Sequence, residues 1–140
     1  MLEQWFPSLR TSAYDITSLG TEDYNCIAHA AAVDTDKWWP HPDYYWPPGR
    51  PINDDSIDNF TETFREVFGY EICADGEFEV GYVKLAIYAH GDRTKHMARQ
   101  IGPGRWTSKL GDERDIGHAL EGLEGQHYGF VARFLRRPST

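Results

Sequence analysis

The stretch VKLAIYAHGDRTKHMARQIGPGRWTSKL, residues 83–110, determines the fold class. Apolar side chains alternate with polar or small ones over 83–88, and the alternation returns over 95–101 after a Gly-Asp turn. A two-residue period is typical of strands. The Gly-Pro-Gly sequence at 102–104 predicts a tight turn, and a third strand is expected over 106–110. This region is therefore expected to form antiparallel strands joined by short turns.

The half of the chain before this stretch indicates helices. A short helix is expected over 26–33, where most residues are small or apolar, with Asn25 as its N-cap. Apolar residues recur every three or four positions over 57–68, which predicts an amphipathic helix. Ser56 is placed to cap that helix, and Gly69 follows its C-terminal end. Helices packed on an antiparallel sheet give the fold class α+β.

The other segments are expected to connect these elements. Residues 1–20 have no clear period and are expected to be irregular, and residues 38–51 form an aromatic, proline-rich loop. A short helix over 116–123 and a last strand over 127–135 are expected to follow the three strands. Residues 136–140 are expected to be a flexible tail.

Composition limits the class of protein. The chain has 140 residues, 40% of them hydrophobic, which is typical of one compact domain. No apolar run has the length of a membrane span, and the N-terminus does not resemble a signal peptide. A net charge of −8 argues against nucleic acid as a partner, and two cysteines fit a reducing compartment. We expect a cytoplasmic protein; a toxin role would require export without a signal peptide.

The charge is unevenly distributed along the chain. Residues 1–80 carry a net charge of −12 and residues 81–140 carry +4. One interpretation is that the two halves pack together and their charges partly cancel. The other is that a basic face of the second half borders a site for an anionic group, with Lys95, Arg99 and Lys109 as its candidates.

Cys26 is a candidate nucleophile because it lies in the first turn of an expected helix. Backbone N–H groups at a helix N-terminus lower a thiol pKa, which favours the reactive thiolate. His96, on an expected strand, is the candidate base. The Cys26 amide and the Asn25 side chain are candidate donors to an oxyanion. The alternative is that Cys26 is a small core residue and His96 an ordinary strand residue.

Several motifs resemble an uncharacterised bacterial domain family, which carries a YNCIAxA start and HxARQ and WTSKLG blocks. The matching segments are YNCIAHA (24–30), WWP (38–40), GYEIC (69–73), VKLAIYA (83–89), KHMARQ (95–100) and WTSKLG (106–111). A cysteine on a helix followed by a histidine on a sheet also resembles the papain-like cysteine hydrolases, especially the NlpC-type amidases. The resemblance implies one papain-like domain over residues 1–140, with Cys26 as nucleophile and His96 as base.

The sequence departs from that family pattern at His29, where the family has tryptophan. His29 lies one helical turn after Cys26 and could reshape the pocket wall or compete with His96 as the partner of the thiol. A side chain at this spacing points along the helix axis, so His96 is the preferred partner.

The residue that orients His96 depends on strand register. A two-residue turn after Gly102 puts Thr107 and Lys109 on the His96 face, whereas one bulge puts Ser108 there. Ser108 is our choice because Lys109 beside the imidazole would disfavour its protonated form. Asp115 is a second option, although it could instead cap the helix expected after it.

The aromatic loop offers a second kind of site. Trp38 and Trp39 provide large, stiff surfaces that suit a peptide, a sugar or a protein partner. The loop that continues to Trp46 could equally cover the core.

Metal and cofactor sites are not expected. Cys26 and His29 have a spacing found in zinc sites, but no second tight pair accompanies them. Nucleotide-binding and zincin motifs are absent, and a Cys26–Cys73 disulfide does not fit a reducing compartment.

The sequence thus supports two hypotheses. The first is a thiol-dependent hydrolase or acyltransferase that acts on an amide bond of a peptide or other amide-containing substrate through Cys26 and His96, as a peptidase, amidase or deamidase. Lys95, Arg99 and Lys109 would favour an acidic substrate. The second is a non-catalytic binding module of the same fold that uses the aromatic loop.

Overall fold

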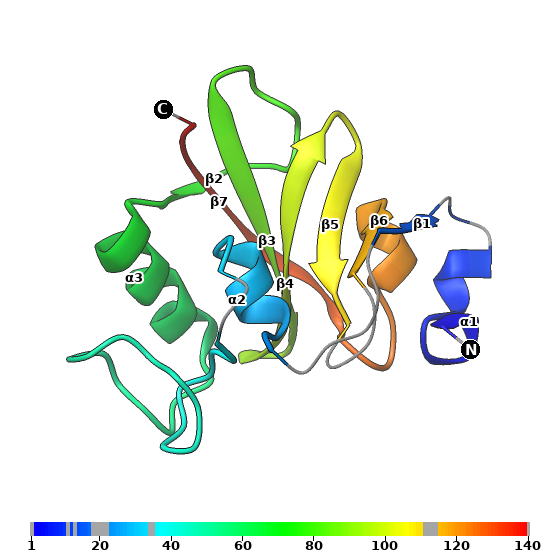
Figure 1. The fold of residues 1–140 in the computed structure, drawn as a ribbon. Helices are drawn as coiled ribbons and strands as arrows, with labels where there is room; N and C mark the ends of the chain where they lie inside the picture. Colours follow the sequence, from blue (N-terminus) through cyan, green and yellow to red (C-terminus); the bar gives the residue numbers. More distant parts are fainter. Residues whose placement is uncertain are drawn as a thin grey trace.

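A computed structural model describes residues 2–10, 12, 14–17, 23–33, 36–110 and 115–139. It has an α+β fold with few helices and a seven-stranded antiparallel sheet of order β1-β6-β5-β4-β3-β7-β2 (Figure 1). In chain order the elements are α1 (Leu2–Trp5), the 3-10 helix η1 (Pro7–Arg10), β1 (Tyr14–Ile16), α2 (Cys26–Ala30), α3 (Ile57–Phe68), β2 (Glu71–Cys73), β3 (Tyr82–His90), β4 (Arg93–Gly102), β5 (Arg105–Lys109), β6 (Asp115–His118), the 3-10 helix η2 (Leu120–Leu123) and β7 (Phe130–Pro138).

Helices α2 and α3 begin at the expected caps. The Asn25 side chain accepts a hydrogen bond from the Ala28 N–H, and Ser56 accepts one from the Asn59 N–H. Gly69 ends α3 in the left-handed region, with φ of 79°, which glycine adopts without steric cost. The caps are local features of the sequence, and local chemistry suffices to set these boundaries.

The three expected strands form, and a bulge sets their register. Gly102 pairs with Arg105 across the turn, as expected, but Gln100 pairs with Trp106. Ile101 is therefore an extra residue on β4, and every later side chain of β5 changes face relative to a regular turn. The bulge puts Ser108 on the same face as His96.

The sheet is covered on both faces. One cluster joins α2, α3 and the aromatic loop to Leu85, Ile87, Met97 and Leu135 of the sheet. The second cluster, on the opposite face, joins the N-terminal segment and η2 to alternate residues of the same strands, including Ala86, Tyr88, Ala98 and Trp106. Figure 1 shows α2 against the middle of the sheet, with α3 and α1 at opposite ends of the molecule. Because both faces of the sheet are covered, even the strand residues Lys84 and Lys109 are fully buried.

Three expectations about the ends of the chain are wrong. The region 116–123 contains the strand β6 and only a 3-10 turn, because Asp115–His118 pairs with β5 on one side and β1 on the other. The expected flexible tail belongs to β7 as far as Pro138, which pairs with Tyr82. The N-terminal segment contains α1, η1 and β1 rather than being irregular throughout.

The tryptophans of the aromatic loop belong to the core. Trp38 and Trp46 are 5% and 8% exposed, and Trp39 packs edge-on against Phe60 at 5.1 Å between ring centres. The exposed aromatic side chains of this loop are Tyr44 and Tyr45. Among the described residues, no helix combines the length and apolar character needed to cross a membrane.

Candidate functional site

Cys26 is the first residue of α2, and its side chain is buried against β4. Burial raises the pKa of the thiol to about 11, although the N–H groups of Met97, Ile27 and Cys26 and the charge of Lys109 act to lower that pKa. The expected stabilisation by the helix N-terminus is present but smaller than the cost of desolvating a thiolate. The expectation of a populated thiolate is therefore wrong, and Cys26 is a protonated thiol at neutral pH.

The Asn25 side chain is held by three hydrogen bonds. Its Oδ1 accepts from the N–H groups of Ala28 and Trp38 at 3.1 and 3.0 Å, and its Nδ2 donates to the Trp38 carbonyl at 2.7 Å. The side chain joins the start of α2 to the aromatic loop. These contacts fix the orientation of the Asn25 amide and use one of the two N–H groups of Nδ2.

His96 is fully buried on β4 and is held by aromatic rings on the second face of the sheet. Its ring stacks on Tyr128 with 4.1 Å between centres and meets Tyr88 edge-on at 5.3 Å. Its Nε2 lies 2.9 Å from Ser108 Oγ. The structure thus brings together His96 and Ser108, as the bulged alternative of the strand register predicts.

A second histidine, His118 of β6, continues this contact. Ser108 Oγ lies 2.6 Å from His118 Nε2, and His118 Nδ1 lies 2.7 Å from the Ala119 carbonyl oxygen. Burial lowers the pKa of His118 to about 4 and that of His96 well below its usual value, so both rings are neutral at pH 7. Sequence reasoning missed this role for His118, because the strand that carries it was expected to be a helix.

The tautomers of His118 and His96 follow from the Ala119 carbonyl, which can only accept a hydrogen bond. The Ala119 carbonyl requires the proton of His118 to be on Nδ1, so His118 Nε2 is an acceptor. The Ser108 hydroxyl must then donate to it, which leaves Ser108 Oγ to accept from the Nε2–H of His96. His96 Nδ1 is consequently unprotonated and carries a lone pair, and it is buried with no hydrogen-bond partner among the described residues.

The resting structure does not pair Cys26 with His96. Cys26 packs in the cluster on the α2 face, whereas the His96 ring contacts aromatic residues of the opposite cluster. The sulfur nevertheless meets the N–H of Met97, the residue that directly follows His96. Because neighbouring residues of a strand point to opposite faces, the Cys26 sulfur and the His96 ring lie on opposite sides of β4, and no hydrogen bond joins them.

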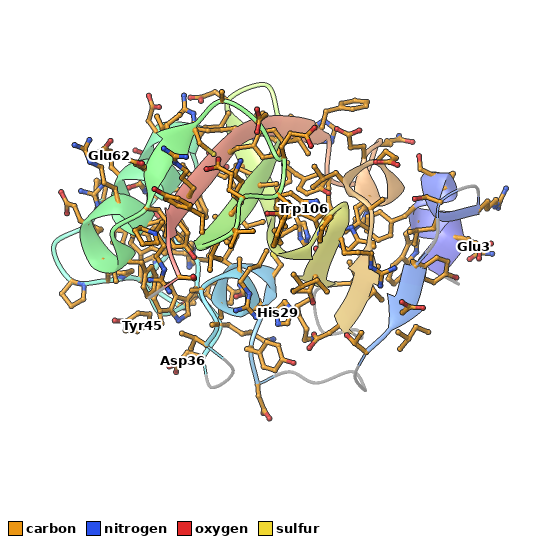
Figure 2. The ribbon with its side chains drawn as sticks, turned by 90° about the horizontal axis from the view of Figure 1, so that it is seen from above. Glu3, His29, Asp36, Tyr45, Glu62 and Trp106 are labelled. Carbon is orange, nitrogen blue, oxygen red and sulfur yellow. The ribbon has the colours of Figure 1, made fainter. Side chains whose placement is uncertain are left out.

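A second group of polar side chains surrounds His29 on the α2 face of the sheet (Figure 2). His29 Nε2 lies 2.9 Å from Thr107 Oγ1, and its Nδ1 lies 3.7 Å from Asp115. The Tyr24 hydroxyl donates to the same Asp115 carboxylate at 2.6 Å. Lys109 is fully buried, with its ammonium 5.4 Å from the centre of the Tyr24 ring. His29, Lys109 and Asp115 therefore belong to one cluster, separate from the contacts of His96.

The two cysteines are both free, and Cys73 lies on β2. In the part of the chain that the structure describes, no three His, Cys, Asp or Glu side chains are grouped so that they could hold a metal ion.

Residues 15–136 match the model of a family described as a domain of unknown function, DUF7689. The chain belongs to the DUF7689 family. Comparison with curated proteins and with solved structures finds no match. The family match agrees with the resemblance to an uncharacterised family. What the DUF7689 domain does must therefore be argued from its own residues.

Proposed function

We propose that this DUF7689 domain is a papain-like thiol hydrolase or acyltransferase that acts on an amide bond. Cys26 is the nucleophile, His96 the base and Ser108 the residue that orients His96. The observation that supports this most strongly is the unprotonated, unpartnered Nδ1 of His96, beside the strand residue whose N–H meets the Cys26 sulfur. An imidazole held through Nε2 with a free Nδ1 is what a general base for a nearby thiol requires.

The resting pair in this proposal is a neutral thiol and a neutral imidazole. As Cys26 Sγ bonds to the substrate carbonyl carbon, His96 Nδ1 accepts the thiol proton. The imidazolium then donates that proton to the leaving nitrogen as the C–N bond breaks, which leaves a thioester. Water, or another acceptor, attacks the thioester carbonyl with His96 again as base, and the thiol is regenerated. Main-chain N–H groups at the start of α2, together with the second N–H of Asn25 Nδ2, bind the oxyanion.

This reaction requires Sγ and Nδ1 to come within hydrogen-bonding range. Catalytic contacts are often long in the absence of substrate and shorten when it binds. Sγ lies at Met97, next to His96 along β4, but the His96 ring points to the opposite face, so substrate binding has to bring the two groups to one side of the strand. Burial disfavours both the Cys26 thiolate and the His96 imidazolium. A substrate that displaces the packing around Cys26 would reduce that burial.

The test uses p-nitrophenyl acetate, an activated ester that reports nucleophiles without knowledge of the natural substrate. Transfer of the acetyl group to a thiol releases p-nitrophenolate, and peptide mass mapping locates the acetyl group. The protein is compared with Cys73→Ala, which removes the other thiol, and with Cys26→Ala. We expect acetylation of Cys26 in the Cys73→Ala protein and a fall of about 100-fold or more with His96→Gln, the usual contribution of a general base.

Acetylation of Cys26 at an equal rate in the His96→Gln protein would overturn the proposal, provided that circular dichroism shows both proteins folded. So would an absence of acetylation at Cys26. Either result would favour the non-catalytic binding module, and the surface to examine would then be the exposed Tyr44 and Tyr45 rather than the buried tryptophans of the loop.

A further inference from the structure

A pocket of about 560 Å³ lies between η2 and the β4–β5 turn, but a smaller pocket of about 320 Å³ has the more specific lining. The smaller pocket is lined by Tyr24, His29, Ala32, Val33, Arg99 and Asp115. These residues come from α2 and its two flanks, from β4 and from β6, so the tertiary fold assembles the pocket.

Arg99 is the cation of this pocket, and its guanidinium has no carboxylate partner among the described residues. Its Nε is buried without a hydrogen-bond partner, and no ion pair joins its guanidinium to a carboxylate anywhere in the described ranges. By contrast, Arg50, Arg93 and Arg136 each form an ion pair within the chain. A buried N–H without an acceptor is costly, and an arginine that lines a pocket in this state can be satisfied by a ligand.

The other polar groups of the pocket are engaged with one another. The Asp115 carboxylate accepts from the Tyr24 hydroxyl, and His29 contacts Thr107. Burial lowers the pKa of His29, and the charges of Arg99 and Lys109 lower it further, whereas Asp115 raises it. His29 is therefore a neutral wall of the pocket, and Arg99 is its cation, with no carboxylate paired to the guanidinium among the described residues.

We propose that this pocket binds a carboxylate through Arg99. A planar carboxylate matches the two-pronged geometry of a guanidinium. Ala32 and Val33 provide an apolar wall for the carbon atoms attached to that carboxylate. A single negative charge fits the site better than a doubly charged phosphate, because the Asp115 carboxylate lines the same pocket and repels additional negative charge.

The pocket and the Cys26 thiol lie along the same strand, β4. Cys26 Sγ meets β4 at Met97, and Arg99 lies two residues further along the same strand. Two residues of a strand span about 7 Å. This step rests on the proposed function. On that function, the pocket binds the carboxylate of an acidic substrate, and the amide carbonyl of the same substrate, a few bonds away, lies at Cys26.

The binding test uses the Cys26→Ala protein, so that no chemistry can follow. Propionate, which has one carboxylate and a short apolar tail, is titrated and followed by two-dimensional NMR of backbone amides and arginine Nε–H groups. Propionamide, which has the same shape without the charge, is the matched ligand control. We expect millimolar binding of propionate with shifts at Arg99 Nε–H, no saturable shifts with propionamide, and weakening by about tenfold or more with Arg99→Gln. Arg93→Gln, an exposed change on the same strand, should leave propionate binding unchanged.

Three results would overturn the pocket proposal: equal binding of propionamide, undiminished propionate binding by Arg99→Gln, or stronger binding of inorganic phosphate than of propionate. A separate arm tests the link to catalysis in the chain that keeps Cys26. It compares p-nitrophenyl acetate with the p-nitrophenyl monoester of succinate, which carries a free carboxylate. Propionate binding without acetylation of Cys26 would refute the proposed function alone, whereas acetylation without propionate binding would refute the pocket alone.

Discussion

Ser108 Oγ lies 2.6 Å from His118 Nε2, and this contact determines where the proton of His96 resides. A serine hydroxyl can donate or accept with equal ease, so Ser108 alone could not select a tautomer of His96. His118, itself fixed by the Ala119 carbonyl, removes that freedom. In the proposed reaction His118 is a positioning residue, two hydrogen bonds away from the base.

Replacement of His118 by Met should release the Ser108 hydroxyl and allow both tautomers of His96. We expect the Nδ1 and Nε2 nitrogen shifts of His96, measured by NMR, to move towards an average, and the acetylation rate of Cys26 to fall about tenfold. His118→Gln has a side chain of similar length whose oxygen can accept from Ser108, so it should retain most of the single-tautomer signal. Unchanged nitrogen shifts in His118→Met would contradict the chain of hydrogen bonds.

The buried histidines should make the protein unstable in acid. The folded-state pKa of His118 is lowered to about 4, below the unfolded value near 6.5, so the unfolded chain binds more protons between these values. Stability is therefore highest above about pH 6.5 and falls as the pH falls towards 4. Between pH 7.5 and pH 5, His118 should account for a loss of about 2 kcal/mol in the free energy of unfolding.

Urea denaturation at pH 7.5 and pH 5 measures this loss. The His118→Gln protein lacks the titrating group, so its free energy of unfolding should change less between the two pH values, by about the same 2 kcal/mol. An identical pH dependence in the two proteins would show that His118 is not held neutral by burial.

Cys26 should be the slower of the two thiols to react in the resting protein. Its pKa of about 11 leaves almost no thiolate at neutral pH, and the side chain is 8% exposed, whereas Cys73 is only partly buried. We expect iodoacetamide at pH 8 to modify Cys73 first, as judged by peptide mass mapping at increasing times. Faster modification of Cys26 would mean that a thiolate is present, contrary to the raised pKa.

The tryptophans of the aromatic loop should matter for stability. Trp38 is 5% exposed and its ring packs on Tyr45 and Phe68, so Trp38→Ala should cost about 3–5 kcal/mol in the free energy of unfolding. Tyr44, at 47% exposed, is the matched control on the same loop, and Tyr44→Ala should cost under about 1 kcal/mol. Similar losses for the two variants in urea denaturation would mean that Trp38 is not a core residue.

Local patterns in the sequence predicted the elements that have local causes. Asn25, Ser56 and Gly69 define the ends of helices through their own side chains or backbone freedom, so α2 and α3 begin where expected. Alternation over 83–110 predicted three strands for the same reason. The strand β6 was missed because it has only four residues and is paired with the preceding strand β5 on one side and with the distant strand β1 on the other.

By itself the sequence determined an α+β domain with a cysteine at a helix N-terminus and a histidine on the neighbouring sheet. Only the tertiary structure decided which groups meet. The one-residue bulge at Ile101 turned Ser108 towards His96, and burial overcame the helix N-terminus and kept the Cys26 thiol protonated. Likewise, Arg99 is one of several basic residues in the sequence, and its uncommitted position in a pocket follows from packing of α2 against β4 and β6. Desolvation depends on segments brought together from afar, and the register of the β4–β5 hairpin depends on a bulge as well as on its turn, so alternation of residue types alone does not determine them.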